Sequence, residues 1–181
     1  VTGSTSGIGL GIARALAQQG ANIVLNGFGD ADGPQAEIAA LGAKVAYHNA
    51  DMSKPAEIEA MMVFAAATFG QVDILVNNAG ISSAAPVEDT SLELWNKNMS
   101  ILGTGYFLVA REGYRLMQKQ KLGGSMIFIG SKNGVTASPG ASAYCSVKAA
   151  EIQLARCMAL EGAPHGIRVN VVNPDAVLRG S

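Results

Sequence analysis

The sequence predicts a doubly wound α/β domain, in which helices cover both faces of a parallel sheet to give three layers. Short runs rich in Val and Ile, apolar on both faces, alternate along the chain with longer runs of helical spacing. Strands that are apolar on both faces are typical of a parallel sheet buried between helices, and this alternation is typical of the α/β class. One domain over residues 1–181 is expected, because the sequence contains no linker or repeat.

Each predicted element rests on its own pattern. The strands are the β-type runs at 21–26, 43–49, 72–78, 124–130 and 166–173. Apolar residues at helical spacing predict helices at 7–20, 34–42, 55–70, about 91–120 and 142–162. A first strand should precede the glycine-rich turn, yet only Val1 and Thr2 do so, and the sequence stops soon after the last strand. We therefore expect a fold that is shortened at both ends, either a fragment or a sheet that lacks its edges.

The composition argues against several classes of partner. Hydrophobic residues make up 49% of the chain and charged residues 15%, and the net charge is −1 with no basic run, which argues against nucleic acid or an anionic membrane. No apolar run is long enough to span a bilayer, and the N-terminus does not resemble a signal peptide. Cys145 and Cys157 are expected on one helix, too far apart to form a disulfide, and they make no metal-binding pattern with His48 or His165. A reduced, cytoplasmic protein without a metal is the expectation.

The glycine-rich turn is the first candidate site. Residues 2–9 read TGSTSGIG and stand between a stub of strand and an amphipathic helix. Glycines at positions 3, 7 and 9 permit a tight turn and a close approach of a pyrophosphate to the backbone. The helix N-terminus would present free N–H groups to the phosphates. The alternative is an ordinary glycine-rich loop, but the position of the turn favours a nucleotide.

The residues after the run at 21–26 bear on which dinucleotide would bind. They read NGFGD, and neither this stretch nor Ser6 supplies the basic side chain that a 2′-phosphate usually meets. Position 27 is Gly rather than the acidic residue often found at the strand tip, and Asp30 follows a few residues later. Missing positive charge therefore predicts NAD rather than NADP.

A tyrosine and a lysine lie four residues apart at the start of the last predicted helix, in the stretch YCSVK at 144–148. Residues at this spacing share a helix face. Alone, the pair is more readily interpreted as two neighbouring surface side chains. Other motifs in the sequence are therefore needed to decide whether the pair is catalytic.

Four features stand in order along the chain: TGSTSGIG, then AD at 50–51, NNAG at 77–80, and Ser131 thirteen residues before YCSVK. Together they resemble the short-chain dehydrogenase/reductase family over essentially the whole chain, which implies a Rossmann fold and an oxidoreductase. The resemblance makes Tyr144 the general acid/base, Lys148 the cation that favours its tyrosinate and holds the nicotinamide ribose, and Ser131 the hydroxyl that positions the reacting oxygen.

The resemblance also implies a cofactor site. Asp51 would accept from the adenine amino group beside the Met52 backbone, and NNAG would line the adenosine ribose. The implied cofactor-binding residues are Gly3, Thr5, Ser6, Gly7, Ile8, Gly9, Phe28, Asp51, Met52, Asn78, Ala79, Gly80, Tyr144, Lys148 and Pro174. Taken singly, NNAG is also a plausible turn and Ser131 a plausible loop hydroxyl.

The chain departs from the family pattern at two places. Many members carry an Asn seven residues after the Trp of the preceding helix, where it organises a water that links the lysine to solvent; here that position is Leu102. Asn98 lies one turn earlier on the same helix face. Either Asn98 or a backbone carbonyl takes over part of this relay, or Asn98 is a surface residue and the relay is absent. The second departure is Asp175 in place of Gly after Pro174, which affects the substrate pocket more than the cofactor site.

Two subfamily resemblances point to different substrates. The stretch GANIVLNGFGD is similar to 3-hydroxybutyrate dehydrogenases, whereas 90–112, SKNG and the last twenty or so residues are similar to the dehydrogenase domain of bifunctional rhamnulose-phosphate aldolase/alcohol dehydrogenases. These imply a 3-hydroxy acid, or a hydroxyaldehyde or sugar-derived alcohol. Lys132 and Asn133 are polar candidates for the pocket, and Lys132 either pairs with an acid or phosphate or is a solvated loop lysine.

The function predicted from the sequence is an NAD-dependent alcohol dehydrogenase or carbonyl reductase. The alternatives are a catalytically silent nucleotide-binding protein and an incomplete chain without a competent pocket. Family members often form tetramers through the helices at 95–120 and 142–162, so a homo-oligomer, dimer or tetramer, is expected, although burial in the core explains much of the same apolar pattern.

Overall fold

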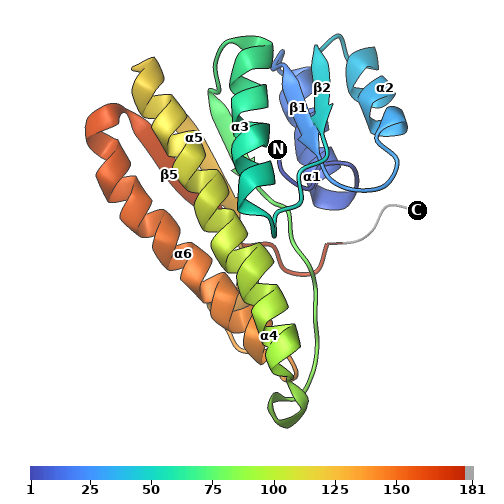
Figure 1. The fold of residues 1–181 in the computed structure, drawn as a ribbon, viewed down its shortest axis with the longest axis vertical. Helices are drawn as coiled ribbons and strands as arrows, with labels where there is room; N and C mark the ends of the chain where they lie inside the picture. The colour runs from blue at the N-terminus through green and yellow to red at the C-terminus, as the bar shows by residue number, and fades with distance from the viewer. Residues whose placement is uncertain (178–181) are drawn as a thin grey trace.

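The computed structural model describes residues 1–177, and it confirms the predicted alternation of strands and helices (Figure 1). The strands are β1 (Ile23–Asn26), β2 (Val45–His48), β3 (Ile74–Asn77), β4 (Gly124–Ile129) and β5 (Ile167–Val172). Each lies within its predicted range, and all the pairings are parallel. The end of the stretch NPDAVLRGS, at 178–181, lies outside the described residues.

The helices follow the prediction with one shifted start. They are α1 (Gly7–Gln18), α2 (Asp32–Ala40), α3 (Pro55–Phe69), α4 (Leu92–Asn98), α5 (Tyr106–Gln120) and α6 (Ser142–Gly162). The predicted start of α2 at residue 34 is wrong by two residues. The Asp30 carboxylate accepts hydrogen bonds from the N–H groups of Asp32 and Gly33, so the helix begins before Pro34, which the first turn tolerates.

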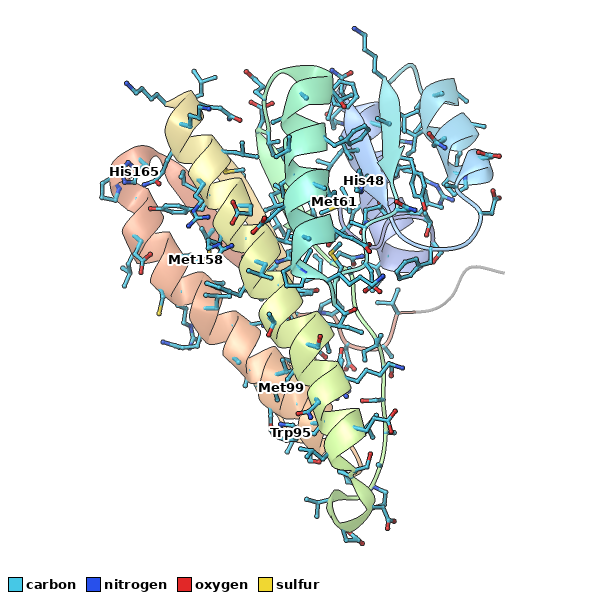
Figure 2. All side chains as sticks on the ribbon, viewed as in Figure 1. His48, Met61, Trp95, Met99, Met158 and His165 are labelled. Carbon is cyan, nitrogen blue, oxygen red and sulfur yellow. The ribbon has the colours of Figure 1, made fainter. Side chains whose placement is uncertain are left out.

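The helices form layers on the two faces of the sheet. The long helices α3, α5 and α6 lie side by side over one face, while α1 and α2 pack against each other and against β1 and β2 (Figure 1). Met61 of α3 and Met158 of α6 belong to the main core (Figure 2). A second, smaller core lies between α1, α2 and the β1–β2 pair. The predicted three-layer arrangement is therefore confirmed.

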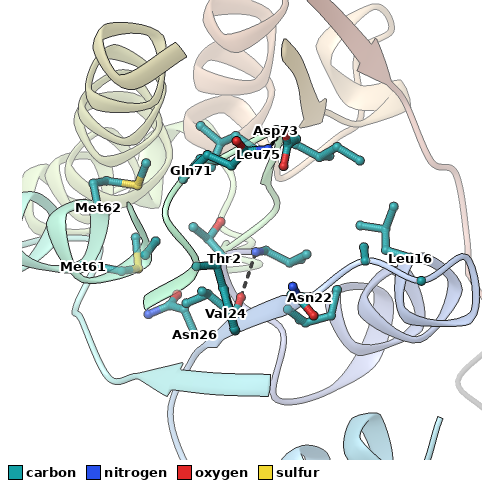
Figure 3. A pocket seen from close by; sticks show the side chains of 18 residues that line it. Thr2, Leu16, Asn22, Val24, Asn26, Met61, Met62, Gln71, Asp73 and Leu75 are labelled. Atoms are coloured by element: carbon teal, nitrogen blue, oxygen red, sulfur yellow. Dashed lines mark hydrogen bonds between the residues drawn. The ribbon is translucent and has the colours of Figure 1, made fainter. Parts of the chain in front are cut away.

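The sheet is divided at the position of the first strand that the sequence predicts before the glycine-rich turn and of which only Val1 and Thr2 are present. Among the described residues, β1 pairs with β2, and β4 pairs with β3 on one side and β5 on the other, but β1 and β3 do not pair with each other. Val1 and Thr2 lie between them, because the Val1 amino group donates to Val24 O and the Thr2 N–H donates to Val76 O, each at 3.0 Å. Beyond these two residues a cavity of about 310 Å³ continues between the strands (Figure 3).

The helix predicted at 91–120 is continuous but not uniform. Between α4 and α5 it widens into the π-helical segment η2 (Met99–Gly105). A Cβ at Gly105 would collide with the carbonyl oxygen of Met52, so glycine permits the close approach of this helix to the end of the β2 region. Such π segments re-aim side chains and are frequent at functional sites. Here η2 carries the fully buried Leu102 into the wall of the large cavity described below.

Short 3₁₀ turns complete the described chain: η1 (Val87–Asp89), η3 (Lys132–Gly134) and η4 (Ala163–His165). Cys145 and Cys157 both lie on α6 as free thiols, as predicted. Within residues 1–177, none of the helices has the length and apolar character needed to cross a bilayer.

Candidate active site

A cavity of about 600 Å³ opens at the carboxyl ends of the strands. This edge of a doubly wound sheet is where such folds bind ligands. The structure brings together on its walls every residue that the sequence predicts for catalysis or cofactor binding: Gly3, Thr5, Ser6, Gly7, Ile8, Gly9, Phe28, Asp51, Met52, Asn78, Ala79, Gly80, Ser131, Tyr144, Lys148 and Pro174. Their roles remain predictions, but their assembly in one cavity does not depend on the family resemblance.

The glycine-rich turn is tightly packed against the end of β3. Gly3 and Gly7 have positive φ angles of 60° and 55°, which glycine adopts at little cost. The Asn78 amide donates to the carbonyl oxygens of Thr2 and Gly3, at 2.9 and 3.0 Å. A Cβ at Gly9 would overlap the Gly3 carbonyl oxygen and lie 2.6 Å from the Asn78 amide nitrogen. Asn78 thus supports the turn itself, a task that the sequence analysis did not assign to it.

The N-terminus of α1 faces this cavity with its first-turn N–H groups available. Ser6 is the N-cap residue, and its hydroxyl makes no capping hydrogen bond. Such a terminus attracts an anion through its free N–H groups and its partial positive charge. The turn and the helix start therefore fit a pyrophosphate, because free backbone N–H groups line the cavity here and Gly7 has open space where a side chain would stand.

Asn26 is a buried organiser of the site that the sequence analysis missed. Its side-chain oxygen accepts from Gly3 N–H, and its amide donates to His48 O and Ala50 O. It therefore ties the glycine-rich turn to the end of β2. A polar Asn at the end of an otherwise apolar buried strand was the available signal, since such a group is retained inside only when it is hydrogen-bonded.

Near Thr5, Gly27 and Phe28, the described part of the chain provides no basic group on the cavity wall that could meet a 2′-phosphate. The Thr5 hydroxyl donates to Phe28 O at 3.0 Å, and Gly27 has a φ of 152° beside it. Asp30 does not line the cavity, because its carboxylate caps α2. Among the described residues, Lys148 is the one basic side chain on the cavity wall, and it lies at the other end with Tyr144 and Ser131.

Asp51 lies on the wall with an ordered carboxylate. Its Oδ1 accepts from the N–H and the hydroxyl of Ser53, at 2.8 and 2.7 Å. These hydrogen bonds lower the pKa of Asp51. The group is therefore a fixed acceptor near neutral pH, which suits the predicted contact with an adenine amino group.

Tyr144 and Ser131 come from different elements and meet at the same wall. Tyr144 is in the first turn of α6, and Ser131 directly follows β4 and caps η3 by accepting from Asn133 N–H. Burial raises the pKa of Tyr144, the Ser131 side chain opposes this rise, and the negative charge of Glu151 adds to it. In the structure the pKa of Tyr144 is thus above its usual value, whereas the sequence predicts a lowered value from Lys148 alone.

Burial is the main cause of the raised pKa of Tyr144, and the surroundings of Lys148 contribute to it. Its ammonium donates to Ile129 O and to the Glu151 carboxylate, both at 2.9 Å. It lies 5.8 Å from the centre of the Tyr144 ring and 4.8 Å from that of Tyr106. The negative charge of Glu151 adds to the rise in the pKa of Tyr144, and the sequence-based expectation did not include Glu151.

Asn98 is not placed on the cavity wall, where the relay considered from the sequence would need it. It is fully buried, so the alternative of a surface residue is also wrong. Its amide donates to Ser83 Oγ and Leu94 O, at 2.9 and 2.8 Å, and it does not line the cavity. It anchors the loop after β3 to α4, while Leu102 closes the wall near Gly80.

We therefore expect Asn98→Ala to destabilise the protein while leaving catalysis almost unchanged. Loss of these buried hydrogen bonds should lower the free energy of unfolding by about 1–3 kcal/mol. Denaturant unfolding measures this change, and kcat should stay within about threefold of the wild-type value because no cavity group is altered. A fall in kcat of about a hundredfold at full folding would restore the relay hypothesis.

The polar candidates for the substrate pocket are engaged elsewhere. Lys132 forms an exposed ion pair with Asp175 and does not line the cavity, although Asp175 does. The Asn133 side chain accepts from the Ser138 hydroxyl at 2.9 Å. Lys132 is therefore neither free in the pocket nor simply solvated, and its partner is the residue that replaces the usual Gly after Pro174.

Comparison with known proteins agrees with this geometry. The family model for short chain dehydrogenases matches residues 1–179. The chain belongs to this family. Among its relatives, a D-beta-hydroxybutyrate dehydrogenase of Cupriavidus necator is 51% identical over 98% of this chain and 69% of its own length. A Bacillus subtilis protein named as an uncharacterized oxidoreductase is 46% identical over 100% of this chain, which spans only 27% of that protein.

Solved structures of short-chain dehydrogenases share the fold. The crystal structure of an acetoin dehydrogenase from Salmonella typhimurium superposes with a TM-score of 0.94 at 35% identity, over 99% of this chain and 76% of that one. The expected family, its Rossmann-type fold and the likeness to 3-hydroxybutyrate dehydrogenases are thus confirmed. The second subfamily resemblance, to bifunctional aldolase/dehydrogenases, stays a prediction.

Proposed function

We propose that this chain is an NAD-dependent oxidoreductase that moves a hydride between the nicotinamide and a small secondary alcohol or the corresponding carbonyl. The observation that carries this proposal is the meeting of Ser131, Tyr144 and Lys148 on the wall of the cavity that also contains the glycine-rich turn. A silent nucleotide-binding protein would have no need of that arrangement. Relatives named as dehydrogenases support it.

The proposed role of each residue follows from its position on the cavity wall. Tyr144 exchanges a proton with the substrate oxygen, Ser131 donates a hydrogen bond that positions that oxygen, and Lys148 supplies positive charge beside them. The turn from Gly3 to Gly9 and the start of α1 hold the pyrophosphate, and the walls at Asp51, Met52 and Asn78 to Gly80 hold the adenosine. We also propose that the chain forms a homo-oligomer, because α5 and α6 expose Phe107 and Leu160. We propose a cytoplasmic location as well.

Two substrate classes each have an observation in their favour. A 3-hydroxy acid is favoured by the 51% identity to a D-beta-hydroxybutyrate dehydrogenase. An uncharged polyol or hydroxyaldehyde is favoured by the cavity wall, since within residues 1–177 the wall has no cation besides Lys148 to pair with a carboxylate. A D-threitol dehydrogenase of Mycolicibacterium smegmatis, 35% identical, is also among the relatives.

The rate of NADH formation from NAD⁺ tests the proposal with 3-hydroxybutyrate and with threitol, each over a range of concentrations. We expect turnover with at least one of them, and the larger kcat/KM identifies the class. A preference for 3-hydroxybutyrate of about a hundredfold would mean that a carboxylate is paired in the complex, since an unpaired charge costs several kcal/mol. No turnover with either, or with other small secondary alcohols, would contradict an oxidoreductase function.

A further inference from the structure

A buried acidic side chain, Glu151, contacts Lys148, the lysine that we propose acts in the reaction. Glu151 is on α6, one turn after Lys148, and is only 2% exposed in a region of apolar side chains. Residues three apart on a helix share a face. A carboxylate in such surroundings is unfavourable unless it is paired, so this position has a specific requirement for an acid or carries a cost that a Val or Leu would avoid.

The pair has a fixed geometry. Glu151 Oε2 accepts from Lys148 Nζ at 2.9 Å, while Ile129 O accepts a second N–H of the same ammonium at the end of β4. The Tyr106 ring covers the ammonium at 4.8 Å. Lys148 is itself only 4% exposed. The ammonium is thus held between the Glu151 carboxylate, the Tyr106 ring and the carbonyl of Ile129, which lies two residues before Ser131 along the chain.

A buried lysine tends to lose its proton, and Glu151 opposes that tendency. Burial lowers the pKa of Lys148, while the charge and the hydrogen bond of Glu151 raise it. Burial likewise raises the pKa of Glu151 from its ordinary value of 4.5 to about 7, against the effect of Lys148. The carboxylate is therefore partly charged near pH 7 and becomes fully charged at alkaline pH, which is the range in which an unpaired buried lysine would become neutral.

We propose that Glu151 is the buried counterion that keeps Lys148 charged at neutral and alkaline pH, and that it is in this way a positioning residue for Tyr144 and Lys148. The inference rests on the proposed function, because it gives that charge a task in the reaction. Oxidation of an alcohol to a carbonyl releases a proton and is favoured at alkaline pH. A site without this anion would lose its cation in that range.

The groups that face Glu151 agree with this assignment. From α6 these are Lys148 and, farther along, Tyr144; from α5 it is Tyr106, whose pKa is raised well above its usual value by burial and then by the Glu151 charge. Tyr106 stays a neutral phenol that donates to Ile129 O at 3.2 Å. Within residues 1–177, Glu151 Oε1 has no hydrogen-bond partner, so Lys148 is the sole hydrogen-bonded cation that holds this carboxylate.

The test measures the titration of Lys148 directly. The pKa of Lys148 is followed by NMR of protein labelled with ¹³C at lysine Cε, and its signal is assigned by its loss in Lys148→Met. We expect Glu151→Gln to lower the pKa of Lys148 by at least about one pH unit, since the amide keeps the shape and removes the charge. Glu161→Gln is the matched control on the exposed side of α6 and should change nothing. An unchanged Lys148 pKa in Glu151→Gln would overturn the proposal.

Kinetics supply the functional half of the test. The ratio of kcat in Glu151→Gln to kcat in the wild type should fall about tenfold as the pH rises from about 7 to about 9. The cofactor Kd of this variant should be nearly unchanged near neutral pH. Glu151→Asp should recover much of the alkaline activity. Parallel pH profiles for the wild type and Glu151→Gln would mean that the pair is only structural. If Gln prevents folding, Glu151→Leu tests the same loss of charge without burying an amide. Should no alcohol be oxidised at all, the proposed function fails, while the NMR titration still decides the role of Glu151.

Discussion

Tyr144→Phe is expected to lower kcat by about a thousandfold or more, because the phenol that we propose as the proton-exchanging group lies on the cavity wall with Ser131. The ring remains, so packing at the start of α6 and the affinity for NADH should change by less than about twofold. Steady-state rates and NADH fluorescence measure the two quantities separately.

Tyr114→Phe is the matched control for this variant. It removes a hydroxyl that donates to Glu161 O at the surface, away from the cavity, and kcat should be unaffected. Retained turnover in Tyr144→Phe would refute the proposed acid/base role, and loss of NADH binding would show that the residue acts on the fold instead.

Gly9→Ala is expected to weaken NADH binding about a hundredfold. The added Cβ would overlap the Gly3 carbonyl oxygen and crowd the Asn78 amide, so the turn must open. Backbone has to move to relieve this overlap, at a cost of about 3 kcal/mol, and the pyrophosphate site is made of that backbone. The midpoint of thermal unfolding should fall as well.

Gly11→Ala provides the comparison on the same helix. A Cβ at Gly11 meets nothing within 4 Å, and alanine is the better helix former. NADH affinity should stay the same and stability should rise slightly. Equal NADH affinity in the Gly9 and Gly11 variants would mean that the turn does not hold the cofactor.

The fold and the cavity residues could be predicted from the sequence where the residues concerned belong to short motifs that follow one another along the chain. Most strand residues are apolar because they pack against the helices, and this pattern can be read directly, although β5 exposes Arg168 and Asn170 on one face. The glycine-rich turn, NNAG, Ser131 and YCSVK each mark the end of a strand or the start of a helix, and a parallel sheet brings such ends together at one edge.

Partners across the fold were harder to predict. Asn26 contacts the glycine-rich turn and the end of β2, so its neighbouring residues do not indicate these contacts. Glu151 lies three residues after Lys148 on α6, and the spacing indicates that the two share a face but not that both are buried. Asn98 was misjudged because helical spacing places it near Leu102 but says nothing about Ser83, which comes from a separate loop. The widening at 99–105 was missed because a π segment has the same apolar pattern as an α-helix.

Titration of the protein with NADH and NADPH, followed by the fluorescence of the reduced nicotinamide, tests the central claim most directly. The account predicts saturable binding of NADH with an affinity at least about tenfold above that for NADPH, because the described wall near Thr5 and Phe28 has no cation for a 2′-phosphate. No saturable binding of either nucleotide, or tighter binding of NADPH, would contradict it.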